Sequence, residues 1–220
     1  MASYFNLTLD TTAPAGLSIT LNDSDIYTTT ATVTLAVALS DEETTGYQMK
    51  VWGTAEATEE KNATWETYQA SSSITLPTGD GLKTVYVKVR DAVGNETTAA
   101  SDTITLDTSV PTVSVTGPDK SVISEVEGFN TAIINFMSDV VFEEYKVCVV
   151  ASSSATQSDG TVIPTTAGST NTSGSDGGYE AETNIQVTIK GTDLETASSG
   201  DGVKIVKVFV RNAAGTWSVA

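Results

Sequence analysis

Apolar and polar side chains alternate along much of the chain, which is the pattern of strands that bury one face. In residues 32–39 every second side chain is Val or Leu, and the same alternation returns in residues 85–90 and 206–211. Asp-Gly and Gly-Asn pairs stand beside these stretches, where turns need a positive φ. The 37 Thr and 24 Val residues add stiff β-branched side chains that favour extended backbone. We therefore predict antiparallel strands joined by turns rather than a bundle of helices.

Two segments of the chain are repeated, at different spacings. Residues 7–14 and 104–111 share five identities in eight positions at a spacing of 97 residues, which is the size of one immunoglobulin-like domain. Residues 79–95 match residues 200–216 at a spacing of 121 residues. Because the second spacing is longer, the second copy of the repeat has gained 24 residues.

The repeat divides the sequence into three parts. Residues 1–10 form an N-terminal strand or attachment segment, residues 11–107 a first domain and residues 108–220 a second domain. The extra residues fall within 151–183, a Ser/Thr/Gly-rich insertion that we expect to be a long exposed loop. The predicted fold class is all-β, with two tandem immunoglobulin-like antiparallel β-sandwich domains.

Five motifs give the sequence a family resemblance: Met49, Trp65-Glu66-Thr67-Tyr68, Ile74-Thr75-Leu76, the block 79–95 and the Leu-Asp-Thr-x-x-Pro linkers. They resemble the tandem immunoglobulin-like repeats of bacterial surface proteins and phage virions. The resemblance covers residues 7–111 and returns over 200–215, but the second copy lacks the Trp-x-x-Tyr element. It implies the sandwich fold and no single function, because such domains act as spacers, decorations and receptor binders.

The charge of the chain and the residues that it lacks narrow the classes of function. Its 28 acidic and 11 basic residues give a net charge of −17, which repels nucleic acid and anionic membrane surfaces. There is no histidine, which excludes Ser-His-Asp triads, Cys-His pairs and ordinary zinc sites. The single cysteine, Cys148, forms no disulfide within the chain. We therefore expect no enzyme, no nucleic-acid partner and no membrane partner.

Acidic and amide side chains of the first copy are expected to gather at one pole of its sandwich. The topology of the fold brings together the entry linker, the turn after the second strand and the turn before the last strand. These segments carry Asp10, Asp41, Asp91 and Asn95, whose hard oxygens suit calcium. The alternative is that these side chains cap turns by accepting hydrogen bonds from nearby backbone amides, with no cofactor bound.

Three aromatic side chains of the first copy form a second candidate site. Trp52, on the outward face of its strand, with Trp65 and Tyr68, would make a platform on which the sugar rings of host glycans stack. The alternative is that the rings pack over the edge of the sheet, because the Trp-x-x-Tyr element belongs to the motif of the resembling family.

The two ends of the chain differ in strand content. Tyr4, Phe5, Leu7 and Leu9 lie in a segment that resembles the end of a last strand, whereas four residues follow the second 17-residue block. We expect this N-terminal segment to add to an open sheet edge, in a second copy of the chain or in another protein. The alternative is that the segment pairs within the first domain and residues 217–219 suffice as a short final strand.

These observations favour a non-enzymatic structural protein of a phage virion: a capsid head fibre, a decoration protein or a tail component. The resemblance supplies the occurrence in virions, and the N-terminus lacks the basic and apolar regions of a secretory signal. Such a protein would be assembled in the host cytoplasm and would bind other virion proteins. The alternative is an adhesin or carbohydrate-binding module of a bacterial surface protein.

Overall fold

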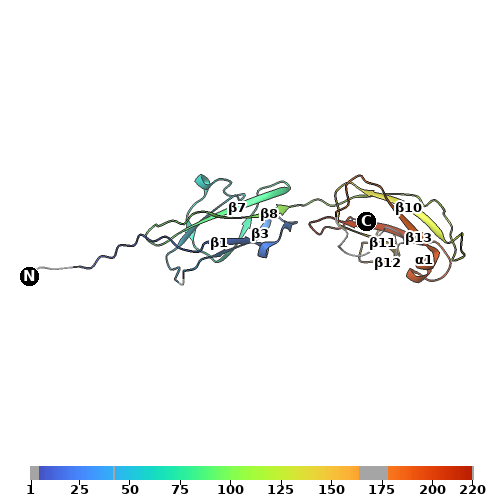
Figure 1. The fold of residues 1–220 in the computed structure, drawn as a ribbon, viewed down its shortest axis with the longest axis horizontal. Coiled ribbons are helices and arrows are strands. Elements are labelled where there is room, and N and C mark those ends of the chain that lie inside the picture. The colour runs from blue at the N-terminus through green and yellow to red at the C-terminus, as the bar shows by residue number, and fades with distance from the viewer. Residues whose placement is uncertain (1–4, 42, 164–177, 220) are drawn as a thin grey trace, which may run out of the picture. The chain divides into compact units, whose positions relative to one another are not determined.

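The computed structural model describes residues 5–41, 43–163 and 178–219, and strands dominate all three ranges. The chain folds as two compact units, Met1–Thr108 and Ser109–Ala220, which we call domain 1 and domain 2. Each domain contains two sheets (Figure 1). The chain is therefore all-β, with tandem immunoglobulin-like sandwich domains. Within the three described ranges, no helix is long and apolar enough to cross a membrane.

Domain 1 has one sheet of three strands and one of five. The first runs in the order β1 (Ser18–Leu21), β3 (Thr32–Ala38) and β6 (Ser71–Thr75). The second runs in the order β2 (Tyr27–Thr28), β8 (Ala100–Leu106), β7 (Gly81–Arg90), β4 (Gln48–Trp52) and β5 (Glu66–Thr67). Neighbouring strands are antiparallel except β2 and β8, which are parallel. Two 3-10 turns lie in the connections, η1 (Asn22–Ser24) and η2 (Glu60–Asn62).

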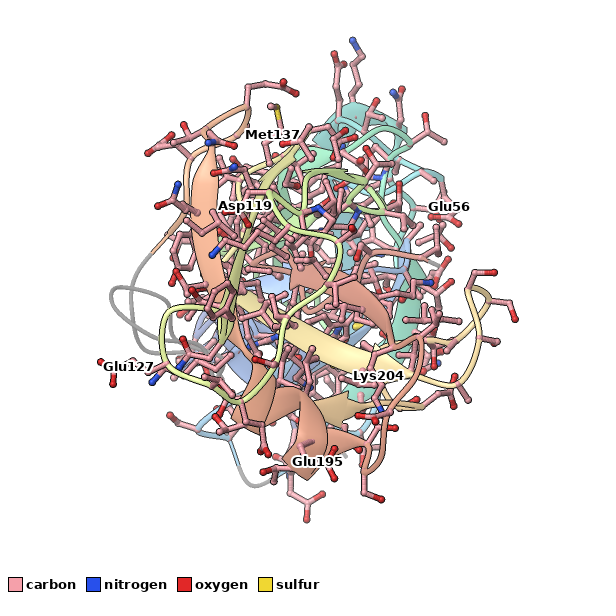
Figure 2. The ribbon with its side chains drawn as sticks, turned by 90° about the vertical axis from the view of Figure 1, so that its right-hand side faces the viewer. Glu56, Asp119, Glu127, Met137, Glu195 and Lys204 are labelled. Carbon is pink, nitrogen blue, oxygen red and sulfur yellow. The ribbon has the colours of Figure 1, made fainter. Side chains whose placement is uncertain are left out.

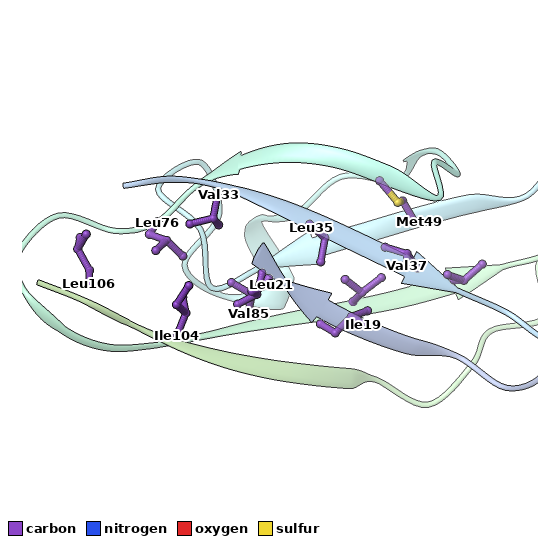
Figure 3. Packing of buried hydrophobic residues seen from close by; sticks show 12 residues of the cluster. Ile19, Leu21, Val33, Leu35, Val37, Met49, Leu76, Val85, Ile104 and Leu106 are labelled. Atoms are coloured by element: carbon purple, nitrogen blue, oxygen red, sulfur yellow. The ribbon is translucent and has the colours of Figure 1, made fainter. Parts of the chain in front are cut away.

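Alternating side chains of both sheets fill the core of domain 1. Val85, Val87 and Val89 of β7 are fully buried, and Ile104 and Leu106 of β8 lie beside them. Figure 3 shows that Val85, Ile104 and Leu106 and the labelled side chains of β1 and β3 point into the same space between the sheets. Burying each such side chain stabilises the fold by about 1.5–3 kcal/mol. The alternation in the sequence thus predicts the inward face of these strands correctly.

The described residues of domain 2 form two sheets of three strands and one helix. One sheet runs in the order β13 (Ile185–Lys190), β10 (Thr131–Ser138) and β9 (Val113–Thr116). The other runs in the order β12 (Thr161–Val162), β11 (Glu144–Val150) and β14 (Ile205–Arg211). The helix α1 (Gly191–Ala197) follows β13, and its Leu194 and Ala197 pack against the core of the domain.

The core of domain 2 is more aromatic than that of domain 1. The ring of Phe136 lies 5.0 Å from that of Tyr145, and the ring of Phe142 lies 4.8 Å from that of Tyr179. Phe136, Phe142 and Tyr145 are almost completely buried. Offset and tilted ring pairs of this kind contribute about 0.5–1.5 kcal/mol each beyond their burial.

The insertion at 151–183 is not an exposed loop over the whole of its described part. Ala155 is buried against the outward side chains Cys148 and Phe209, and Ile163 is fully buried in the core. The Lys207 ammonium donates hydrogen bonds to the carbonyls of Ser153 (2.7 Å) and Ala155 (3.0 Å). The prediction of an exposed loop therefore fails at Ala155 and Ile163, whereas most other described residues of the insertion are exposed. Residues 164–177 of the insertion lie outside the described residues.

Candidate functional site

The structure brings the four predicted calcium ligands to one pole of domain 1. Burial, and then the negative charges of Asp41, Asp91 and Asp10, raise the pKa of the Tyr47 hydroxyl at this pole. Asn95 lies between Asp91 and the entry linker, because its amide nitrogen donates to Asp91 Oδ2 at 2.7 Å and to the carbonyl of Asp10 at 3.4 Å. The sequence therefore predicted correctly that these residues gather at one pole, which is separate from whether they bind calcium.

Each carboxylate of this pole accepts a hydrogen bond from a backbone amide. Asp91 Oδ1 accepts from the amides of Val93 and Asn95, both at 2.9 Å. Asp41 Oδ2 accepts from Ala15 at 2.9 Å, and Asp10 Oδ1 accepts from Thr12 at 3.0 Å. Within the described part of the chain, no group of three or more Asp, Glu or Cys side chains is arranged to hold a metal ion. The geometry is that of turn capping, and calcium binding stays a prediction.

Domain 2 builds the same turn with an amide in place of the carboxylate. Asn212 Oδ1 accepts from the amide of Thr216 at 2.8 Å, as Asp91 does from Asn95. Its Nδ2 donates to the carbonyl of Ser109 at 3.3 Å, as Asn95 does to the linker before domain 1. Since a neutral side chain serves equally well here, capping explains the residue types at this pole.

Asp91→Asn is expected to keep the bonds from the backbone amides of Val93 and Asn95, to lose the acceptor for the Asn95 side-chain amide, and to reduce the dependence of the turn on pH. Burial would raise the pKa of Asp91, but hydrogen bonds from Asn95, Val93 and Gly94 hold it below its ordinary value. The stability contributed by the ionised group is therefore present above the pKa of an unfolded aspartate, about 4, and is lost as the pH falls through the folded value. Urea unfolding at neutral pH and at about pH 3 should show a smaller acid loss in the variant.

A second substitution separates capping from charge. Asp91→Ala removes all of these hydrogen bonds and should lower the stability of domain 1 by about 1–3 kcal/mol at neutral pH. Wild-type stability of Asp91→Ala in the same unfolding experiment would contradict the capping role.

The three predicted glycan-stacking residues do not form one exposed platform. Trp52 points outward, yet it is buried and stacks on Tyr86 at 5.3 Å with an interplanar angle of 7°. Trp65 lies over the Arg90 guanidinium at 4.3 Å and the Lys50 ammonium at 4.9 Å. The prediction of a platform is wrong, because Trp52 and one face of Trp65 are already covered.

Tyr68 is also used inside domain 1. Its hydroxyl donates a hydrogen bond to the carbonyl of Val37 at 3.0 Å, and its ring packs against the core. Burial raises the pKa of this hydroxyl. The packing alternative therefore describes the Trp-x-x-Tyr element.

Trp217 takes the place of Trp65 in domain 2, which the sequence did not reveal. Its ring lies 4.4 Å from the Lys146 ammonium and 5.9 Å from the Arg211 guanidinium. Lys146 lies opposite Phe209 and Arg211 lies opposite Glu144, so the two cations are diagonal neighbours on β11 and β14, as Lys50 and Arg90 are on β4 and β7. Cation–π contacts of this kind contribute about 0.5–2 kcal/mol. The two tryptophans come from different parts of the repeat, so an alignment of the copies does not match them.

The apolar N-terminal segment makes no strand in domain 1. Phe5, Leu7 and Leu9 are 86%, 87% and 85% exposed, and residues 5–10 contain no strand. Figure 1 shows this segment running away from the sheets of domain 1 as an extended chain. The alternative of pairing within the first domain is therefore wrong for these residues. Tyr4 lies outside the described residues.

Domain 2 carries a groove of about 880 Å³ beside β14. Its floor consists of core side chains of β10 and β13, and α1 and the 117–125 connection form its sides. Lys204 and Glu195 lie at its rim, on the same side of the domain (Figure 2). The apolar side chains that line this groove include Val115, Ala132, Ile134, Ile189, Leu194 and Val206.

Comparisons with known proteins identify no family for the chain. No family model matches the sequence, and no curated protein sequence matches it significantly. Among solved structures, it is similar to the fibronectin(III)-like modules of CbhA from Clostridium thermocellum, with 12% identity, a TM-score of 0.47 and coverage of 91% of this chain and 89% of that chain.

Two further similar structures come from intimin and from a chitinase. The D00-D0 domain of intimin is 16% identical with a TM-score of 0.31, and the match covers 92% of this chain and 96% of that chain. The chitinase ChiA74 from Bacillus thuringiensis is 16% identical with a TM-score of 0.32, and the match covers 92% of this chain but 30% of the chitinase. At these identities and TM-scores the comparisons assign no activity, and the fold assignment rests on the sheets themselves.

Proposed function

We propose that the chain is a non-enzymatic structural protein of a phage virion, a head fibre, decoration protein or tail component that displays its immunoglobulin-like domains. The observation that carries this proposal is that the side chains of both candidate sites bond or pack within domain 1 itself. The acidic pole caps its own turns, and the aromatic side chains cover their own sheets. Among the exposed apolar side chains of the described residues, Phe5, Leu7 and Leu9 alternate along one extended segment, which suits assembly rather than catalysis.

The acidic character of the chain supports a displayed position. A net charge of −17 favours solubility and opposes contact with nucleic acid, so the domains would face solvent rather than the packaged genome. The partners under this proposal are other virion proteins.

Labelling of purified virions tests the proposal. Antibodies against the protein should mark particles at one structural location in electron micrographs, and the protein should copurify with infectious particles. Antibodies pre-absorbed with the protein serve as the control. Unlabelled virions together with label on the envelope of uninfected bacteria would contradict the proposal.

The second candidate function is glycan binding by a bacterial surface module. One observation favours it: Tyr86 is 37% exposed and is backed by the stacked ring of Trp52, which leaves an aromatic face toward solvent. Binding on a glycan array that is lost in Tyr86→Ala would support this function over the structural one.

A further inference from the structure

The final strand of domain 1 has no equivalent in the described part of domain 2. The match of residues 79–95 with residues 200–216 makes β14 the counterpart of β7. In domain 1, β7 lies between β4 and β8, whereas β14 pairs with β11 alone among the described strands. Between 212 and 219, Trp217 makes one isolated bridge with Arg211 and Ser218 bonds Val210. The edge of β14 before Val210 is therefore open to another strand.

The groove of domain 2 lies where β8 lies in domain 1. In domain 1, Ile104 and Leu106 of β8 are buried, and β8 lies beside β1, whose Ile19 is only 8% exposed (Figure 3). In domain 2 the counterpart of Ile19 is Val115, which is 48% exposed and lines the groove. Val206, the counterpart of the fully buried Val85, is only partly buried. The apolar residues that β8 would cover in domain 2 thus remain open to solvent.

The chain carries a second copy of the strand that fills this position in domain 1. Residues 7–14 repeat residues 104–111, so Leu7 and Leu9 correspond to Ile104 and Leu106 of β8. Phe5 continues the same alternation, which places all three apolar side chains on one face of an extended strand. All three side chains are exposed in the structure.

The register of the missing pairing follows from domain 1. There β7 and β8 are antiparallel, with Lys83 opposite Ile104 and Gly81 opposite Leu106. Each residue of β7 is replaced by its counterpart 121 residues later, and each residue of β8 by its counterpart 97 residues earlier. The register then predicts three pairs: Phe5 with Val206, Leu7 with Lys204, and Leu9 with Gly202.

The two residues that make a polar contact at the end of β8 also have counterparts in the repeats. Asp80 Oδ1 accepts hydrogen bonds from the amide (3.0 Å) and hydroxyl (2.9 Å) of Thr108, which follows β8. The corresponding residues are Asp201, four residues before β14, and Thr11, after the N-terminal segment. Both the residue types and their positions are retained, so Asp201 is placed to receive Thr11 in the same way.

We propose that residues 5–11 of one copy of this chain bind as the last strand of domain 2 of a second copy. The segment pairs antiparallel with the open edge of β14, its three apolar side chains enter the groove, and Thr11 bonds Asp201. The surfaces that meet are different, so the contact is head-to-tail and repeats along an open chain of copies. Because each copy is strongly acidic, repulsion opposes this contact, and added salt strengthens it by screening.

Charge substitutions at neighbouring positions test the contact. Sedimentation velocity of the full chain over a range of concentrations should show oligomers for wild type. Leu7→Asp places a carboxylate in the groove and should leave monomers, whereas Thr8→Asp adds the same charge on the solvent face and should keep the oligomers. Both residues precede the folded part of domain 1, so neither change disturbs its fold. A monomeric wild type at every concentration, or equal behaviour of the two variants, would overturn the proposal.

Disulfide cross-linking tests the register. Leu7→Cys and Lys204→Cys proteins are mixed and oxidised; opposite residues in such a pair lie about 5.5 Å apart, within the range of a disulfide. We expect a cross-linked heterodimer, and much less of it when Thr8→Cys replaces Leu7→Cys. Cross-linking that is equally efficient for both positions, or absent for both, would overturn the assigned register.

Discussion

Replacing Arg211 with methionine is expected to lower the stability of domain 2 by about 3–5 kcal/mol. The Arg211 Nε donates to Glu144 Oε2 at 2.8 Å, and the Glu144 side chain is only 4% exposed. Removing the guanidinium leaves a carboxylate in the protein interior without its cation, which costs far more than losing an exposed ion pair. Scanning calorimetry of the full chain should show a domain 2 transition lowered by roughly 10–20 °C.

Domain 1 supplies the matched control for this substitution. Arg90 occupies the corresponding place, but its partner is the neutral Gln48, which accepts bonds from Nε at 2.8 Å and Nη2 at 2.6 Å. Arg90→Met should lower the stability of domain 1 by about 1–3 kcal/mol, because it leaves a neutral amide, rather than a charged group, without its hydrogen-bond partner. The double variant Glu144→Leu with Arg211→Met should recover most of the loss. Equal losses from Arg90→Met and Arg211→Met would contradict the role assigned to the buried charge.

Gly53→Ala is expected to destabilise domain 1 by about 3 kcal/mol or more. Gly53 follows β4 with φ +83°, and an added Cβ would stand 2.1 Å from the carbonyl oxygen of Thr84 on β7. That atom belongs to a central strand and has no room to move, so the strands must separate. Urea unfolding followed by tryptophan fluorescence gives the measurement, since Trp52 adjoins the substituted residue.

The control for this variant separates steric overlap from backbone conformation. Gly79 has nearly the same φ, +85°, but an added Cβ would meet nothing within 4 Å. Gly79→Ala should therefore cost only the conformational strain, about 1 kcal/mol. If the two variants were equally stable, the close approach of β4 and β7 at Gly53 would not matter energetically.

The strands that the sequence predicted best are those whose two faces differ most. In β3 and in residues 85–89 of β7 every second side chain is aliphatic and buried, so these strands are recognisable from a hydrophobic period of two residues. Trp52 shows where this reasoning stops. It stands on the outward face as expected, yet the connection after β4 folds over it, and Glu60 in that connection binds Lys88 at 2.8 Å. The alternation of apolar and polar residues predicts which face of a strand is inward, but it does not predict whether another segment of the chain covers the outward face.

For the candidate sites, too, the sequence predicted some features and not others. Residue types alone brought Asp41, Asp91 and Asn95 to the correct pole, because the topology of a sandwich fixes which turns meet. Whether their oxygens face outward to an ion or inward to backbone amides depends on turn geometry, which residue types do not encode. Trp217 was missed for another reason. It contacts the corresponding cations of domain 2, as Trp65 does in domain 1, but the two tryptophans do not align when the repeats are compared.

The burial of Cys148 has a practical consequence for experiments on this protein. The thiol is fully buried between β11 and the 151–160 connection; burial raises its pKa, an effect that outweighs the lowering by Lys146. Because it is the only cysteine in the sequence, a cysteine introduced at the surface would be the one site that reacts readily with a maleimide dye. Fluorophores or spin labels can thus be attached at a chosen residue of otherwise native protein.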